Sequence, residues 1–226
     1  MDALQRIVGA RHVEAGAIVG DTALTGAARA LVRPGSAAEV AEVVRWCYAN
    51  DVAMVPVGGQ TGFAGGASPL GDDVVAVALE RLRAVRSFDP LLWRMEAEAG
   101  VTTATVARLA RENGLLFAPD PGAAERSQLG GTIATNAGGP HAFKYGVTGD
   151  WVMALEAVLA PGELVRFGGP VRKDVAGYDL CGLLTGSEGT LGIVTAAWLR
   201  FVPAPEAALP VAATYADAAA GCAAIE

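Results

Sequence analysis

The chain has 226 residues, of which 52% are hydrophobic and 18% charged, a composition that excludes a disordered protein and allows one domain with a smaller satellite. Its 29 glycines follow no strict repeat, so a collagen-like chain and a simple linker are also excluded. The formal net charge of -7 disfavours nucleic acid or an anionic membrane as partner, because either would need a basic surface.

Cysteine and histidine usage is sparse. Cys47, Cys181 and Cys222 are odd in number and far apart, which indicates neither a disulfide framework nor a thiolate metal site. His12 and His141 are the only histidines, so we expect no histidine-built metal centre. The chain has no apolar leader and no uninterrupted apolar window of about 18 residues. We therefore expect a cytoplasmic protein without a transmembrane segment.

The first strong helix signal is Ser36 followed by Glu39, a capping-box signature, with apolar residues at helical spacing up to Asn50. Two β-branched runs follow, 52–57 and 74–80, and a glycine-dense loop separates them. This part of the chain predicts helix, strand, loop and strand.

A further strand is predicted at 92–99, and Thr102 opens a helix that Gly114 ends. Residues 117–150 have no sustained period, so we expect a long ordered loop, which is usually functional. Helices and strands in this mixture indicate an α+β fold.

The last predicted elements are a hairpin, 151–160 with 163–169, and a strand at 190–202. Pro161-Gly162 suits the two central positions of a type II turn in that hairpin. A proline-spaced linker follows at 203–210, then a strand entering an alanine-rich helix. We expect residues 1–205 to form one domain and 206–226 to be a linker and the start of a truncated second domain; a short protein with a C-terminal helix is the alternative.

Three glycine-dense segments carry the chemical signal. In PVGGQTGFAGG, 56–66, backbone N–H groups without neighbouring Cβ atoms can form an anion-binding concavity, although a flexible hairpin loop is an equal alternative. The loop matches neither a P-loop nor a Rossmann fingerprint. The segment 127–150 offers small polar side chains to a ligand, or is an Ω-loop packed on itself. GSEGTLG at 186–192 lacks the spacing of a nucleophile elbow, which disfavours a serine hydrolase.

Five segments occur in unbroken order: PVGGQTGFAGG, FAPDPGAAERSQLGGTIATNAGG, KYGVTGDWVMALEAVL, RKDVAGYDL and TGSEGTLGIVT. Together they resemble the FAD domain of the vanillyl-alcohol-oxidase or p-cresol-methylhydroxylase type flavoproteins, over about residues 30 to 205. Within that family the segments look like the FAD subunit of bacterial glycolate oxidase and the D-2-hydroxyacid dehydrogenases. The resemblance implies an α+β FAD domain of two subdomains, with the cofactor extended between them and the cap domain missing or truncated.

The resemblance also implies the cofactor-binding residues. The loop at 57–62 matches the pyrophosphate-binding position of the family, residues 128–138 match positions along the diphosphate, ribityl and flavin parts, and Ile193 matches the strand beside adenine. The complete set is Val57, Gly58, Gly59, Gln60, Thr61, Gly62, Asp120, Gln128, Gly131, Thr135, Asn136, Ala137, Gly138, Glu188 and Ile193.

Five positions depart from the family pattern. Gln60 replaces a glycine, Gly62 a serine, Gln128 a threonine or serine, and Asp174 an asparagine. Thr61 stands where some members carry the histidine that attaches FAD, so we expect a noncovalent flavin.

The function implied is an FAD-dependent oxidoreductase module acting on a small 2-hydroxy acid such as glycolate, D-lactate or D-2-hydroxyglutarate. The alternatives are a non-catalytic flavin-binding subunit that needs a partner subunit or the missing cap domain, and an incomplete reading frame. We assign no catalytic and no metal-ligating residue. Lys144, Tyr145 and Tyr178 are interpreted as shaping their loop, and His141 as solvated.

Overall fold

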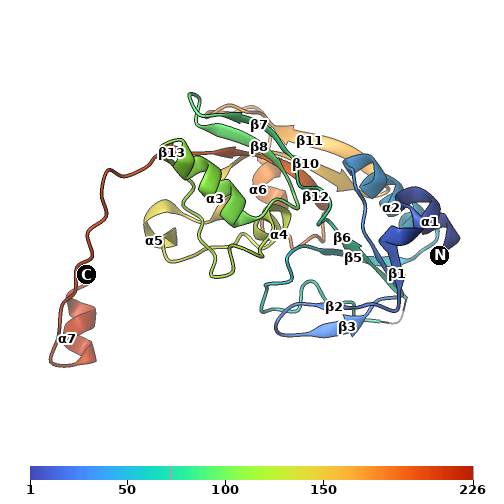
Figure 1. Cartoon of the computed structure of the whole chain (residues 1–226), viewed down its shortest axis with the longest axis horizontal. Helices are drawn as coiled ribbons and strands as arrows, with labels where there is room; N and C mark the ends of the chain where they lie inside the picture. The colour runs from blue at the N-terminus through green and yellow to red at the C-terminus, as the bar shows by residue number, and fades with distance from the viewer. Residues whose placement is uncertain (72, 226) are drawn as a thin grey trace.

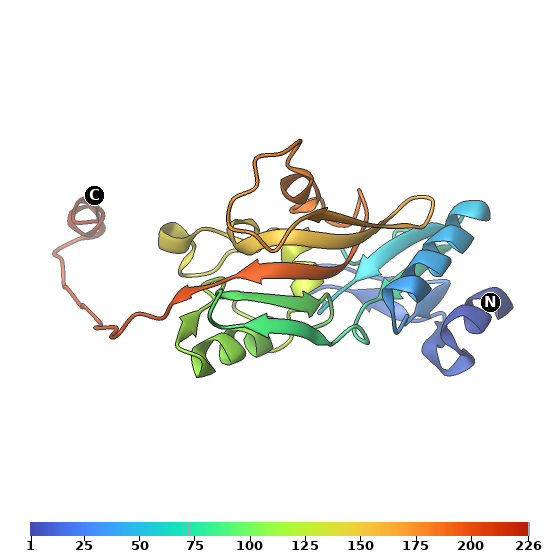
Figure 2. The same ribbon diagram turned by 90° about the horizontal axis from the view of Figure 1, so that it is seen from above.

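Two β-sheets lie side by side in the computed structural model, which describes residues 1–71 and 73–225 (Figures 1 and 2). The first has the strand order β1-β4-β6-β5 and the second the order β11-β10-β12-β8-β7. Together with the helices, this is the α+β fold of two subdomains that the sequence predicts.

The four-stranded sheet is built around a parallel core. It comprises β1 (Val13–Ala15), β4 (Ala30–Val32), β6 (Val74–Ala78) and β5 (Ala53–Val57). Strand β6 pairs in parallel with both β4 and β5 and is buried along most of its length, which explains its continuous apolar sequence. A separate two-stranded sheet, β2 (Ile18–Gly20) with β3 (Thr25–Ala27), contributes to the apolar cluster on this side of the molecule.

Helices α1 (Asp2–Val8) and α2 (Ala37–Ala49) pack together beside this sheet, and a short 3-10 helix, η1 (Ala10–His12), follows α1. The predicted cap is confirmed, because the Ser36 hydroxyl accepts a hydrogen bond from the Glu39 N–H at 3.2 Å. Helix α2 also contacts β10 of the other sheet, so it joins the two halves of the molecule.

The five-stranded sheet is antiparallel throughout. Its strands are β11 (Glu163–Gly168), β10 (Val152–Leu159), β12 (Ile193–Arg200), β8 (Arg94–Glu98) and β7 (Val85–Asp89). Helices α3 (Thr103–Glu112) and α4 (Leu129–Ala134) bury one face of it. Phe117 packs edge-to-face on Trp151 and on Phe201, with ring centroids 5.7 and 5.9 Å apart. This aromatic cluster fixes the segments that lead into and out of α4.

Several expectations need correction. The N-terminal elements up to β4 and strand β7 lack a long periodic pattern and were not predicted. The segment 117–150 is not one irregular loop, because it contains α4, α5 (Ala142–Tyr145) and the 3-10 helix η2 (Thr148–Trp151). The turn of the β10–β11 hairpin closes through Gly162 N–H to Leu159 C=O, so cis Pro161 is its third residue and the turn is not type II.

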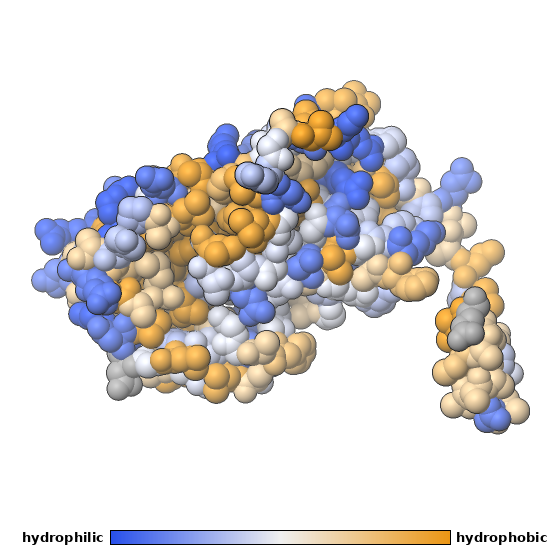
Figure 3. Space-filling view, turned by 180° about the vertical axis from the view of Figure 1, so that it is seen from behind, coloured by the Kyte–Doolittle hydropathy of each residue, from blue (hydrophilic) through white to orange (hydrophobic). Residues whose placement is uncertain are grey.

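The remaining short elements are α6 (Leu180–Leu184) and the pair β9 (Leu115–Leu116) with β13 (Val202–Pro203). The segment after β13 stands away from the body and ends in α7 (Ala218–Ala223), and Figure 3 shows apolar residues over much of its surface. Its residues 205–225 are exposed apart from half-buried Gly221, and the strand expected after residue 210 is not formed. Residue 226 of the expected C-terminal segment lies outside the described residues. No helix in the described parts of the chain is long and apolar enough to cross a membrane, and the longest, α2, has 13 residues.

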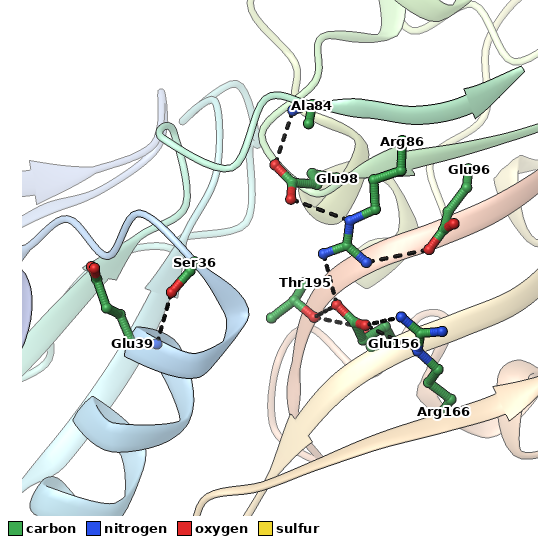
Figure 4. A network of polar contacts seen from close by, with 9 residues as sticks. All are labelled: Ser36, Glu39, Ala84, Arg86, Glu96, Glu98, Glu156, Arg166 and Thr195. Carbon is green, nitrogen blue, oxygen red and sulfur yellow. Dashed lines mark hydrogen bonds and ion pairs between the residues drawn. The ribbon is translucent and has the colours of Figure 1, made fainter.

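The other face of the five-stranded sheet carries an ion network (Figure 4). Buried Glu156 accepts hydrogen bonds from Arg86 at 2.9 Å, Arg166 at 2.8 Å and the Thr195 hydroxyl at 3.0 Å. These donors hold the pKa of Glu156 below its ordinary value, although burial alone would raise it. The network crosslinks β7, β10, β11 and β12 on the face away from α4.

Candidate functional site

A cavity of about 900 Å³ lies between the two halves of the molecule. One wall is the loop that follows β5, and the opposite wall is α4 with the segments 121–138 and 188–194. All of the residues expected to bind FAD line this cavity except Asp120. They are Val57, Gly58, Gly59, Gln60, Thr61, Gly62, Gln128, Gly131, Thr135, Asn136, Ala137, Gly138, Glu188 and Ile193.

The loop 58–67 presents main chain to the cavity. In the described parts of the chain, no protein group accepts a hydrogen bond from the N–H groups of residues 58–63. A Cβ atom on Gly59 would overlap the carbonyl oxygen of Arg126, so only glycine allows this approach. Gln60 has a φ of 56°, in the left-handed region that a glutamine side chain disfavours. The N–H groups of residues 58–63 are thus free to bind a ligand. The loop also holds Gln60 in a backbone conformation that a residue with a side chain disfavours.

Helix α4 supplies the opposite wall. Gln128 is its N-cap residue, and the Oε1 atom of Gln128 is buried and has no hydrogen-bond partner among the residues that the structure describes. Gly131 faces the cavity, since the nearest atom to a Cβ placed there is the Cα of Gly58 at 3.9 Å. The Thr135 hydroxyl donates to the carbonyl of Gly131 at 3.0 Å. This wall therefore combines an unsatisfied acceptor with open space.

Two further residues of the set have left-handed backbone conformations, Asn136 with a φ of 48° and Glu188 with a φ of 51°. Asn136 uses its side-chain oxygen to accept the Gly149 N–H at 2.8 Å, which fixes the turn after α5. The Glu188 N–H donates to the Ala134 carbonyl at 2.8 Å and so ties its segment to α4. Such conformations concentrate at ligand-binding sites, where surrounding contacts maintain them.

The charged residues of the cavity are all acidic. Asp21 and Glu188 line it, and no Lys, Arg or His does among residues 1–71 and 73–225. Burial raises the pKa of Asp21, but hydrogen bonds from the N–H groups of Ala23, Leu24 and Gly65 outweigh this and lower it below its ordinary value. An anion entering the cavity would therefore meet backbone N–H groups rather than cationic side chains.

Asp120 lies outside the cavity lining. One of its carboxylate oxygens is 3.9 Å from the Nδ1 atom of His141, and both side chains are about half exposed. Gly139 packs against the main chain of Asp120. Lys144 and Tyr145 also lie outside the lining, with the Lys144 amine 4.9 Å from the Tyr145 ring, and Tyr178 is almost fully exposed.

The sequence patterns missed several lining residues, including Asp21, Leu79, Ala99 and Pro121. Asp21 precedes a short turn, a pattern that predicts a local Asx-turn and nothing more. Its cavity position depends on a contact with Gly65, 44 residues away, which no local pattern encodes. Leu79 and Ala99 follow strands and look like ordinary core residues.

Comparison with known proteins identifies similar chains. Residues 28–168 match the family described as FAD binding domain. D-lactate dehydrogenase of Anaerostipes hadrus is 40% identical over 197 residues, which cover 86% of this chain and 41% of that protein. D-2-hydroxyglutarate dehydrogenase of Xanthomonas citri pv. viticola is 43% identical over 176 residues, covering 78% and 37%. "Glycolate oxidase subunit GlcD" of Bacillus subtilis is 39% identical over 186 residues, covering 82% and 39%.

Among solved structures, an alkyldihydroxyacetonephosphate synthase matches with a TM-score of 0.70 and 27% identity, covering 80% of this chain and 35% of that one. The chain thus spans about two fifths of the length of the three curated relatives named above.

The residues of the cavity fit FAD. The free N–H groups of 58–63 suit a pyrophosphate, and Gly131 leaves open the space that a Cβ would occupy. The unsatisfied Gln128 Oε1 is a hydrogen-bond acceptor, and FAD has hydroxyl and N–H groups that can donate to it. The cavity volume, about 900 Å³, lies within the range of ligand pockets.

Proposed function

This chain belongs to the FAD binding domain family, and we propose that it is the FAD-binding module of a flavin-dependent oxidoreductase that acts on a small 2-hydroxy acid. FAD is its cofactor. The substrate class rests on the names of the relatives, which include a D-lactate dehydrogenase, a D-2-hydroxyglutarate dehydrogenase and a glycolate oxidase subunit. When bound, the cofactor supplies the two-electron redox chemistry.

One observation carries the proposal. The described lining has no cationic side chain, and it includes a loop whose N–H groups have no protein acceptor. Binding of a doubly charged pyrophosphate to an acidic protein needs donors that are already oriented toward it. Residues 58–63 line the cavity, and their N–H groups have no acceptor among the described residues, which supports this role. We therefore assign the pyrophosphate to residues 57–62.

The remaining contacts follow from the shape of the cavity. We assign Gln128, Gly131 and the segment 135–138 to the diphosphate, ribityl and flavin parts of FAD, and Ile193 with Glu188 to the adenine end. Asp120 receives no contact in this assignment, because it lies outside the lining. The flavin is held without a covalent bond, since no His, Cys or Tyr lines the cavity in the part of the chain that the structure describes.

We propose the domain boundary at residue 205. Residues 1–205 form the FAD-binding domain, and residues 206–226 are a linker and the start of a second domain that covers the substrate. The lack of burial in 205–225 supports this division. The lining has no cationic side chain to bind a substrate carboxylate among the described residues, so we assign that role to a further domain or a partner subunit. A flavin-binding subunit without activity of its own is the second candidate, and the same observation favours it.

The test is a titration of the flavin-free chain with FAD, followed by flavin fluorescence and absorbance. We expect saturation at one FAD per chain. A folded chain that takes up no FAD would contradict the proposed function, whereas equal uptake by a Gly131→Val variant would contradict the assignment of α4 to the cofactor.

A further inference from the structure

The β2–β3 hairpin precedes the residues that match the family. It packs against the second half of the loop 58–67 and against the residues that follow the loop. The Ser68 hydroxyl donates a hydrogen bond of 2.5 Å to the carbonyl of Leu24 at the tip of the hairpin. A Cβ atom on Gly26 would overlap the main chain of Pro69, so the two backbones are in direct contact. The hairpin therefore contacts the residues that directly follow the loop, Ser68 and Pro69.

Asp21 makes the connection between the two. One carboxylate oxygen, Oδ2, accepts the N–H of Gly65 at 2.7 Å. The other, Oδ1, accepts the N–H groups of Ala23 at 2.9 Å and Leu24 at 3.1 Å within the hairpin turn. The N–H of Thr22 donates to the carbonyl of Gly62 at 3.1 Å, and the Thr22 hydroxyl donates to the same oxygen. Two successive hairpin residues thus hold both ends of the segment 62–65.

We propose that Asp21 is a positioning residue, which braces the loop 58–67 against the β2–β3 hairpin so that its N–H groups stay aimed at the pyrophosphate of FAD. The part of this inference that concerns FAD rests on the proposed function. A glycine-rich loop loses much backbone freedom on binding an anion, and a loop that is already fixed avoids that loss. Hydrogen bonds from N–H groups to a carboxylate are stronger than bonds between neutral groups, so the carboxylate suits this role.

Charge repulsion would act in the opposite direction, because the Asp21 carboxylate lines the cavity and carries a charge of the same sign as the pyrophosphate. If repulsion dominated, removing the charge would strengthen FAD binding. Three N–H donors already compensate the two oxygens, which favours the brace. The two effects have opposite signs, so one substitution separates them.

The substitution is Asp21→Asn. Asparagine has one acceptor oxygen where aspartate has two, so either the bond to Gly65 or the pair within the turn is lost. Its matched control is Asp89→Asn, because Asp89 accepts the Leu92 N–H at 3.1 Å in the turn between β7 and β8, away from the cavity. The measurements are amide hydrogen exchange of residues 62–66 in the flavin-free chains and the FAD dissociation constant.

We expect Asp21→Asn to speed exchange at 62–66 and to weaken FAD binding, each by roughly tenfold or more, the range of a hydrogen bond to a charged group. Asp89→Asn should leave both unchanged. Thr22→Val, which removes the hydroxyl bond to Gly62 and keeps the N–H bond, should give a smaller change in the same direction. This variant keeps the test valid if Asp21→Asn fails to fold.

Tighter FAD binding by Asp21→Asn would overturn the inference in favour of charge repulsion. Faster exchange with unchanged FAD affinity would show that Asp21 holds the loop but does not contribute to FAD binding. Unchanged exchange would show that Asp21 does not hold the loop at all. If the unsubstituted chain binds no FAD while exchange still rises in Asp21→Asn, the proposed function fails and the contact between hairpin and loop stands.

Discussion

Gly58 and Gly131 pack closely where two walls of the cavity meet, so that a Cβ atom on Gly58 would lie 3.4 Å from the Cα of Gly131. The loop that follows β5 and helix α4 meet at this point through their main chains. A Cβ on Gly131 would have ordinary clearance from the protein and would extend into the cavity.

Gly131→Val should therefore abolish FAD retention and leave the chain folded. The valine side chain would extend into the cavity, and in a helix valine is no less favourable than glycine, so the chain should still fold. Flavin absorbance and circular dichroism measure the two effects. Gly169→Val is the control, because a Cβ there is 3.8 Å from Val171 and outside the FAD cavity, and it should retain FAD. Full flavin content in Gly131→Val would show that α4 does not contact the cofactor.

Gln60→Gly should bind FAD as well as the natural chain or better. Gln60 has a φ of 56°, which costs a residue with a side chain roughly 1 to 2 kcal/mol and costs glycine almost nothing. Part of that gain is offset by the greater freedom of glycine in the unfolded chain, so the unfolding free energy should rise by at most about 1 kcal/mol. A fluorescence titration and thermal unfolding measure both quantities. Weaker FAD binding would assign the Gln60 side chain a direct role.

The fold was predictable from sequence where one element carries a sustained pattern. The Ser36 cap with its helix, strands β5 and β6, and the hairpin strands were found in this way. The N-terminal strands, with three residues each, are too short for a period to emerge. Helix α4 was missed because its sequence LGGTIA contains two glycines, and only packing against β12 and β8 makes it helical.

The cavity lining was predictable where its residues belong to sequence motifs. The glycine-dense loop at 56–66 and the departure at Gln60 are both visible in the local sequence. Asp21 has no such local signal, because its role depends on a contact over 44 residues. Asp120 shows the reverse case: it belongs to a matching motif, but it lies outside the lining, with its carboxylate 3.9 Å from the Nδ1 atom of His141.

The flavin should be fully released by acid. Thr61 stands where a histidine would attach the flavin, and no His, Cys or Tyr lines the cavity among the described residues. Trichloroacetic acid precipitation followed by absorbance of the supernatant measures the released fraction. Yellow colour remaining on the washed pellet would contradict noncovalent binding.

Glu156→Gln should lower the unfolding free energy by about 3 kcal/mol, the cost of removing one partner from a buried ion pair. Arg86 would then keep its contacts to Glu96 and Glu98 but lose its most buried partner. Urea denaturation measures the change. Glu112→Gln breaks only the exposed pair with Arg108 and should change the unfolding free energy by less than about 1 kcal/mol.

The same network gives stability a pH dependence. The pKa of Glu156 is lower in the folded chain than in the unfolded chain, so its contribution is fully present above the ordinary glutamate value of about 4.3 and is lost as pH falls below it. Thermal midpoints between about pH 3 and 6 should therefore fall more steeply in the natural chain than in Glu156→Gln. Parallel profiles would show that Glu156 is not the titrating group.

The flavin-loaded chain of 226 residues should show little or no turnover with glycolate, D-lactate or D-2-hydroxyglutarate. Oxidation of a 2-hydroxy acid requires a bound carboxylate, a group that accepts the hydroxyl proton and a site closed to water. The described cavity lining offers no Lys, Arg or His for the first two. Anaerobic mixing with each acid should leave the flavin absorbance unchanged, whereas dithionite should bleach it.

When residues 1–205 replace the matching part of the Anaerostipes hadrus D-lactate dehydrogenase, a D-2-hydroxy acid should bleach the flavin. Rapid bleaching of the chain alone would mean that residues 117–180 already hold a complete active site. A flavin-loaded chimaera that no 2-hydroxy acid bleaches would contradict the proposed substrate class.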